Sequence, residues 1–145
     1  MGTTYFYKCE DGWQKFKNSC YKMIVAEKTW KDAENDCVKS GAHLASIHSV
    51  EENDFINKLH DLTGVSTWIG GIRDGRSFKW SDGSAFCYQN WHREGPNWQE
   101  PNNLGEKEDC LELYSSGSIE YHGYWNDYPC DATSRIARYV CKKRK

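Results

Sequence analysis

The segment Glu100-Pro101-Asn102, followed along the chain by Glu108 and by Trp125-Asn126-Asp127, gathers oxygen-bearing side chains in one part of the sequence. Calcium prefers about six to eight oxygen ligands and mixes carboxylate with carbonyl oxygens. The carboxylates and amides of this segment would supply most of such a shell and leave positions open for a ligand. The same groups match the donors and acceptors that bind a pair of sugar hydroxyls. The segment therefore predicts a calcium-held sugar site with the ligands Glu100, Asn102, Glu108, Asn126 and Asp127.

The size and charge of the chain exclude several classes of partner. Its 145 residues suffice for a single domain, 1–145, with a buried core. The formal net charge of -2 provides no basic field for nucleic acid. No apolar run is long enough for membrane insertion. The terminal Lys142-Lys143-Arg144-Lys145 is interpreted as a solvated chain end, with weak binding to acidic glycans or membrane surfaces as the alternative.

Seven cysteines in so short a chain predict disulfides and a secreted, extracellular protein. None of them forms a Cys-x-x-Cys pair, so a zinc or redox site is disfavoured. Met1-Gly2-Thr3-Thr4 shows no signal peptide, and we interpret the chain as a mature secreted domain or as a fragment of a longer protein.

Hydrophobic periodicity predicts two helices followed by short strands. A hairpin-like segment is expected over 9–25. Thr29 and Ser49 each begin a helix in a capping position, and Gly41 and Gly64 end the two helices. Strands are predicted at 66–70, 78–80, 111–114, 124–127 and 138–141. Between 81 and 109 the chain is rich in Gly, Pro, Asn and Asp and predicts a long irregular loop, so the fold class is α+β.

Short motifs in a fixed order carry a family resemblance over residues 9–141. They are Trp30 to Cys37, His43-Leu44-Ala45-Ser46-Ile47, Trp68-Ile69-Gly70-Gly71, Trp80-Ser81-Asp82-Gly83, Glu100-Pro101-Asn102, Glu108-Asp109-Cys110, Trp125-Asn126-Asp127 and Val140-Cys141. On these motifs the chain resembles the C-type lectin-like domain. The resemblance implies two helices flanking short antiparallel sheets, with a long irregular calcium-binding loop.

The resemblance also implies a disulfide pattern. The implied pairs are Cys37–Cys141, Cys110–Cys130 and, as in long-form members, Cys9–Cys20. The sequence alone leaves all of the roughly 15 pairings of six cysteines open. Cys87 is left over, and two interpretations stay open: an interchain bridge in a homodimer, as in members resembling snake-venom lectins, or a buried or capped free thiol.

The five ligand candidates fall on the family's principal calcium positions, and Pro101 resembles the family's cis proline. Glu-Pro-Asn order resembles members that bind vicinal equatorial 3- and 4-hydroxyls, as in mannose, N-acetylglucosamine, glucose or fucose. Calcium is therefore the implied cofactor, and glycans or glycoproteins on cell surfaces are the implied partners. A second calcium is not expected: Asp74 and Asp109 are available, but Asn103 stands where members often carry an acid.

Aromatic residues beside the Glu-Pro-Asn motif leave galactose-type sugars as an alternative ligand class. Trp98 lies two residues before Glu100, and Tyr121, His122 and Tyr124 precede Trp125. Stacking of Trp98 on a sugar ring would permit galactose or N-acetylgalactosamine despite the Glu-Pro-Asn order, while structural packing of Trp98 is the alternative. His122 is interpreted as a surface residue and Trp125 as a core residue.

Two functions of other classes compete with a lectin. Glu100 and Glu108 would serve as acid and base in a hydrolase, but no nucleophile motif supports an enzyme, and we predict none. A lectin-like domain that binds protein is the other alternative. Such members often lose the calcium ligands that this chain keeps.

Overall fold

The computed structural model describes residues 8–59, 65–91, 101–103, 107–114, 123–133 and 135–144. Both predicted helices are present, as α1 (Trp30–Lys39) and α2 (Val50–Leu59). The strands are β1 (Gln14–Phe16), β2 (Ser19–Val25), β3 (His43–Leu44), β4 (Ser66–Asp74), β5 (Ser77–Trp80), β6 (Cys110–Leu113), β7 (Trp125–Tyr128) and β8 (Ile136–Arg144). The class is α+β, as predicted.

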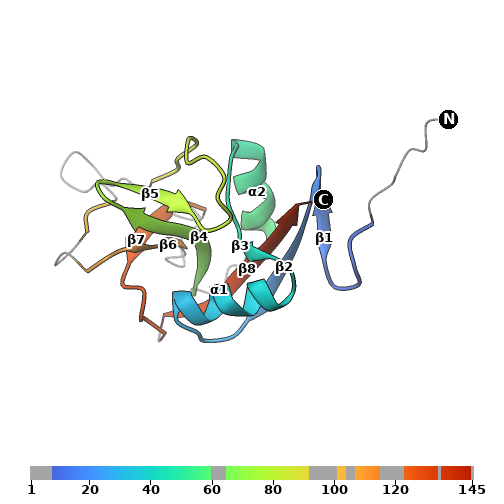
Figure 1. Ribbon diagram of the computed structural model, residues 1–145, viewed down its shortest axis with the longest axis horizontal. Coiled ribbons are helices and arrows are strands. Elements are labelled where there is room, and N and C mark those ends of the chain that lie inside the picture. The colour runs from blue at the N-terminus through green and yellow to red at the C-terminus, as the bar shows by residue number, and fades with distance from the viewer. Residues whose placement is uncertain are drawn as a thin grey trace.

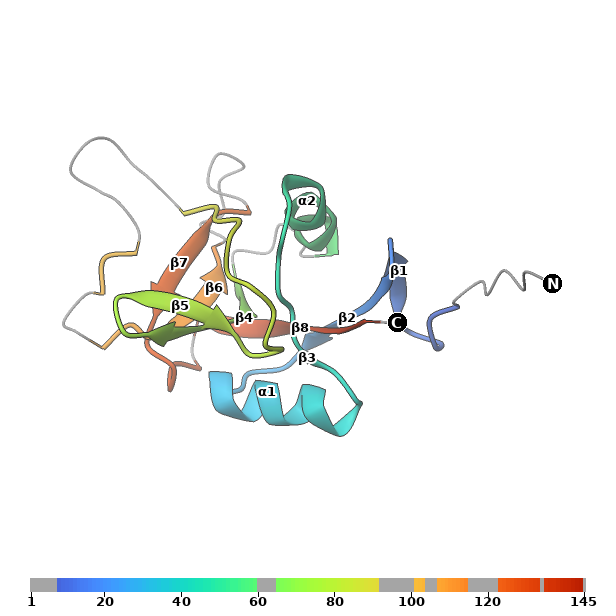
Figure 2. The same ribbon diagram turned by 45° about the horizontal axis from the view of Figure 1, so that its top comes forward.

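The described strands join into one sheet of order β1-β2-β8-β4-β6-β7, with β3 beside β8 and β5 beside β4. All pairs are antiparallel except β4 with β8, so the sheet is mixed where short antiparallel sheets were expected. Figure 1 shows β5, β6 and β7 at the end of the molecule away from the β1–β2 hairpin. Figure 2 shows α1 and α2 on opposite sides of the band formed by β2, β3 and β8.

Helix α1 begins where the sequence predicts it to begin. The Thr29 hydroxyl accepts a hydrogen bond from the Asp32 amide at 3.2 Å, which satisfies one of the free amides of the first turn. Trp30, Ala33, Glu34 and Cys37 form the buried face. The helix ends before Gly41, whose φ of 74° lies in the left-handed region that glycine adopts without strain.

Helix α2 has an unexpectedly polar buried face. The Ser49 hydroxyl caps it by accepting from the Glu52 amide at 3.0 Å, as predicted. Ile56 is buried, but so are Glu52 and Asn53. Phe55 and Leu59 pack only partly against the core, and Gly64, the predicted end of the helix, lies outside the described residues. The apolar pattern therefore located the helix without revealing the charge that it buries.

The interpretation of Lys142-Lys143-Arg144-Lys145 as a solvated chain end is wrong for Lys142, whereas Arg144 is exposed. Lys142 to Arg144 belong to β8, which pairs with β2 as far as Ser19. Lys142 also lies opposite His43 of β3 and is only 5 % exposed. Strand pairing across most of the chain length, rather than local sequence, therefore determines the environment of this lysine.

Three disulfides close the fold, and they are the pairs that the resemblance implied. Cys37–Cys141 joins α1 to β8, Cys110–Cys130 joins β6 to the turn after β7, and Cys9–Cys20 closes the N-terminal hairpin. Cys87 is a free, exposed cysteine.

The core lies on both sides of the sheet and is rich in aromatic side chains. One cluster surrounds Trp80 and Trp125, whose rings meet edge to face at 5.3 Å, and a second surrounds Trp68. Trp125 is fully buried, as expected. The backbone of Leu44 passes so close to Gly70 that a Cβ there would lie 2.4 Å from the Leu44 carbonyl oxygen, so only glycine fits.

Candidate functional site

Strand β7 carries two of the predicted ligands, and α2 anchors its first residue. The Trp125 indole Nε1 donates to the Asn53 Oδ1 at 2.8 Å, and the Asn53 amide donates to the Gly123 carbonyl. The pairing of β7 with β6 places Asn126 opposite Glu112 and Asp127 opposite Leu111. A buried tryptophan and a buried amide therefore hold Asn126 and Asp127 in register on the rigid part of the fold.

The Asp127 carboxylate organises the site. It is fully buried, and it accepts the backbone amide of Asn102 on Oδ1 at 3.1 Å and that of Asn103 on Oδ2 at 2.7 Å. The Arg73 guanidinium Nη2 donates to the same Oδ2 at 3.0 Å. The segment that contains the Glu-Pro-Asn motif is thereby tied to Asp127 of β7.

Glu108 is tied to the same segment through its backbone. Its amide donates to the Asn103 Oδ1 at 3.0 Å, and its carbonyl accepts from the Arg73 Nη2 at 2.7 Å. Asn103 has a φ of 45°, a left-handed conformation that asparagine tolerates better than most residues. Asn103 therefore has a definite structural role: its side chain bridges the motif to the Glu108 segment.

A buried acid that the sequence analysis did not single out orients Asn126. The Asn126 Nδ2 donates to the Glu112 Oε1 at 3.2 Å, which leaves the amide oxygen, the atom that a hard cation binds, on the other branch of the amide. Glu112 is fully buried and bonds the Arg135 guanidinium at 2.6 Å. Burial raises the pKa of Glu112 to about 7, against the opposing charge of Arg135. A charged residue between two leucines of the predicted strand Leu111-Glu112-Leu113 was the sequence feature that could have indicated this buried acid.

The described part of the predicted set fits a hard cation. Asp127 and Glu108 are buried acids, Asn102 and Asn126 add amide oxygens, and oxygen-only donor sets of this kind suit calcium. Among the described residues no group of three or more His, Cys, Asp or Glu side chains is placed to hold a metal. The predicted calcium ligands would not form such a group among the described residues. Two of the ligands are asparagines, and Glu100 lies outside the described residues.

The aromatic candidates beside the motif are only partly described. Trp98, Tyr121 and His122 lie outside the described residues. Tyr124 is 37 % exposed and follows Gly123, whose carbonyl accepts from Asn53 and Asn90.

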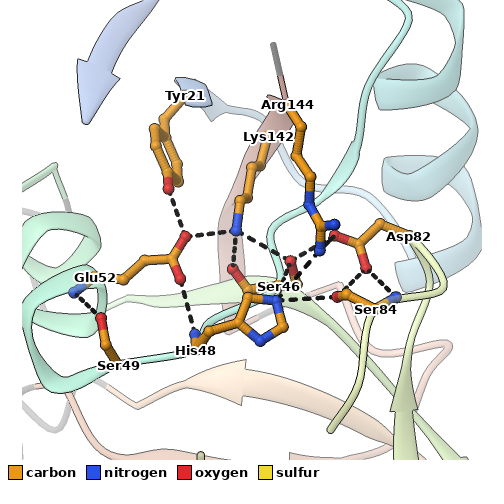
Figure 3. A network of polar contacts seen from close by, with 9 residues as sticks. All are labelled: Tyr21, Ser46, His48, Ser49, Glu52, Asp82, Ser84, Lys142 and Arg144. Carbon is orange, nitrogen blue, oxygen red and sulfur yellow. Dashed lines mark hydrogen bonds and ion pairs between the residues drawn. The ribbon is translucent and has the colours of Figure 1, made fainter. Parts of the chain in front are cut away.

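A second polar cluster contains a serine, a histidine and an aspartate, but it lacks the geometry of a nucleophile (Figure 3). The Ser84 hydroxyl lies 3.0 Å from the His48 Nε2. Asp82, however, accepts hydrogen bonds from the Ser84 and Ser46 hydroxyls and not from the other ring nitrogen of His48, where a catalytic acid would lie. Partial burial and the Lys142 charge lower the pKa of His48. The cluster is an electrostatic network within the fold.

Comparison with known proteins places this geometry in a family context. The family model described as the lectin C-type domain matches residues 26–143. "Lactose-binding lectin l-2" of Anguilla japonica is 40 % identical over 85 % of this chain and 72 % of its own length. "Lectin" of Pleurodeles waltl is 42 % identical over 92 % of this chain and 75 % of its own length.

Solved structures with the same fold include both a carbohydrate-recognition domain and an antifreeze protein. The cow carbohydrate-recognition domain of CD23, solved in the presence of a GlcNAc2Man3 oligosaccharide, superposes with a TM-score of 0.80 at 31 % identity over 95 % of this chain and 97 % of its own. A calcium-independent type II antifreeze protein superposes with a TM-score of 0.81 at 28 % identity over 98 % of each chain. Fold similarity alone therefore does not distinguish sugar binding from other activities.

Proposed function

The chain belongs to the C-type lectin domain family, a family of non-enzymatic domains known for carbohydrate binding, and we propose that it binds sugars through one directly coordinated calcium ion. The observation that carries the proposal is the tie between the Glu-Pro-Asn segment and β7: the buried Asp127 carboxylate accepts the Asn102 amide, and Arg73 joins the same carboxylate to the Glu108 carbonyl. Glu100, Asn102, Glu108, Asn126 and Asp127 would hold the ion. A calcium-independent antifreeze protein shares the fold, so these oxygen ligands, rather than the fold, support calcium.

The proposed chemistry is binding by ligand exchange. Two vicinal sugar hydroxyls would complete the shell of an ion held by these residues, and they would donate to the carboxylates of Glu100 or Glu108 and accept from the amides of Asn102 or Asn126. Two hydroxyls on an open surface bind one sugar weakly, so useful affinity requires several sites in one assembly. Glycans or glycoproteins on cell surfaces are the proposed partners. The three disulfides and the lectin relatives support a secreted, extracellular protein.

Two sugar classes are supported by different observations. The Glu-Pro-Asn order favours equatorial 3- and 4-hydroxyls, as in mannose, N-acetylglucosamine, glucose or fucose. The lactose-binding relative favours a galactose-type sugar, with Trp98 as the residue that would set the ring orientation by stacking. We take the mannose type as the primary proposal and the galactose type as the second.

Parallel columns of mannose-agarose and lactose-agarose test the proposal. We expect retention on one column in calcium and release by a chelator, and a glycan array then defines the sugar. Glu108→Gln removes a ligand charge while keeping side-chain size, and we expect it to abolish retention. The control Glu51→Gln removes an exposed charge on α2 and should leave retention unchanged.

The outcomes separate the proposals. Retention that survives the chelator, or no retention on either column or the array, would count against a calcium-dependent lectin. If the lactose column retains the protein, Trp98→Ala should weaken that retention. Unchanged sugar preference in Trp98→Ala would argue against the stacking role.

We also propose that Cys87 links two chains. The thiol is exposed, and an unpaired cysteine in an oxidising environment tends to form an intermolecular bridge. Non-reducing electrophoresis is expected to show a dimer band that reductant converts to monomer and that Cys87→Ser abolishes. A single monomer band before reduction would contradict the linkage.

A further inference from the structure

Arg73 lies among oxygen atoms of three acidic residues. It lies near the end of β4, and its side chain is 19 % exposed. Its Nε donates to the Asp109 Oδ1 at 2.9 Å, and its Nη2 donates to the Glu108 carbonyl at 2.7 Å and to the Asp127 Oδ2 at 3.0 Å. Two carboxylates and one carbonyl from three residues therefore converge on one guanidinium.

Other contacts fix the guanidinium in that place. Its carbon lies 4.6 Å from the centroid of the Phe78 ring, within the range of a cation–π interaction. The Arg73 backbone amide also donates to the Asp109 carbonyl at 2.7 Å. Both the main chain and the side chain of Arg73 therefore bind Asp109. The planar fork of arginine satisfies several fixed acceptors at once, which the ammonium of lysine does less well.

The acceptors of Arg73 are parts of the proposed calcium site. Asp127 is a proposed ligand, Glu108 is another, and the Asp127 Oδ2 that Arg73 binds also holds the Asn103 amide. Arg73 lies between the buried Asp127 carboxylate and the half-exposed Asp109 carboxylate, and without its positive charge the two negative charges would be left facing the same space. The arginine therefore links three segments that the chain must bring together before any ion arrives.

We propose that Arg73 is a positioning residue that takes the place of a second cation and keeps the sugar site assembled when calcium is absent. The expected effect on calcium binding rests on the proposed function. The role of Arg73 in holding the segments together concerns the calcium-free protein. Asp109, one of two acids available for a second calcium, is already engaged by the guanidinium. The chain should therefore bind one calcium, at a site whose ordering cost is largely met beforehand.

Hydrogen exchange in chelator tests the structural part. In Arg73→Met we expect the amides of Asn102, Asn103 and Glu108 to exchange at least about tenfold faster than in the parent. Arg73 binds Asp127, the acceptor of the first two amides, and it binds the carbonyl of Glu108 itself. Amides of the β2–β8 ladder should be unchanged, which also shows that the variant is folded. Arg76→Met, at an exposed turn position, is the matched control, and Arg73→Lys should give an intermediate effect.

Calcium titration tests the expected effect on calcium binding. In Arg73→Met, the loss of ordering and the loss of positive charge change the calcium affinity in opposite directions. We expect the parent to bind one calcium and Arg73→Met to bind it about tenfold more weakly, since the segment must then be ordered on binding. Loss of the positive charge alone would strengthen calcium binding. Tighter binding by Arg73→Met without faster exchange, unchanged exchange in that variant, or two calcium ions in the parent would overturn the inference. A parent that binds no calcium would contradict the proposed function. The exchange experiment would still test whether Arg73 holds these segments together.

Discussion

Replacing Cys37 and Cys141 together with alanine is expected to lower the free energy of unfolding by about 5 kcal/mol. This disulfide spans a sequence separation of 104 residues, and constraining so long a loop removes much conformational entropy from the unfolded chain. It also joins α1 to β8, which lies near the middle of the sheet. A loss of this size approaches the whole stability of a small domain, so the variant should be largely unfolded at 37 °C.

Urea unfolding of two disulfide variants provides the comparison. Cys9→Ala/Cys20→Ala removes a bridge with a separation of only 11 residues, and we expect it to cost about 3 kcal/mol in the same chain-entropy model. Equal losses of unfolding free energy in the two variants would contradict the explanation that the stabilisation depends on loop length. The result would then assign the effect to local packing around the sulfur atoms.

Replacing Lys142 with methionine is expected to cost about 3 kcal/mol of unfolding free energy. The Lys142 ammonium lies 2.5 Å from the Glu52 Oε2, and both side chains are almost fully buried. Removing one partner leaves the other as an uncompensated buried charge. We place the cost at the low end of the usual range because Tyr21 and the His48 amide still donate to Glu52 (Figure 3).

A double variant separates the charge effect from lost packing. Lys142→Met combined with Glu52→Gln removes both charges, and we expect it to recover much of the loss because no buried ion then remains unpaired. Lys79→Met, at an exposed position of β5, is the matched control and should change stability little. A double variant as unstable as the sum of its single variants would show that Lys142 and Glu52 are not coupled.

The sequence predicted those features that depend on neighbouring residues. Thr29 and Ser49 cap their helices because a hydroxyl three residues before an amide is a local relation. Trp125 was expected in the core, and it is fully buried there against Trp80. The disulfide pairs required the family resemblance, since spacing alone left every pairing open.

Features that depend on distant partners were not predictable in the same way. Lys142 is buried only because β2 and β3 flank its position in β8, so a local run of basic residues gave the wrong interpretation. Arg73 was not singled out, because its partners lie on segments 36 and 54 residues away. For the candidate site, the sequence proposed the ligand types, but only the folded chain shows which backbone amides hold Asp127.

The central claim is that sugar binds to the calcium ion itself, and measuring each affinity with and without the other ligand tests it most directly. Calorimetric titration of calcium would be carried out with and without a saturating amount of the sugar that the columns identify, and the sugar would be titrated with and without calcium. Direct coordination predicts that each ligand strengthens the other by the same factor, as linkage requires, and that sugar binding is undetectable in chelator. A calcium affinity that the sugar leaves unchanged, or sugar binding that persists in chelator, would contradict the account.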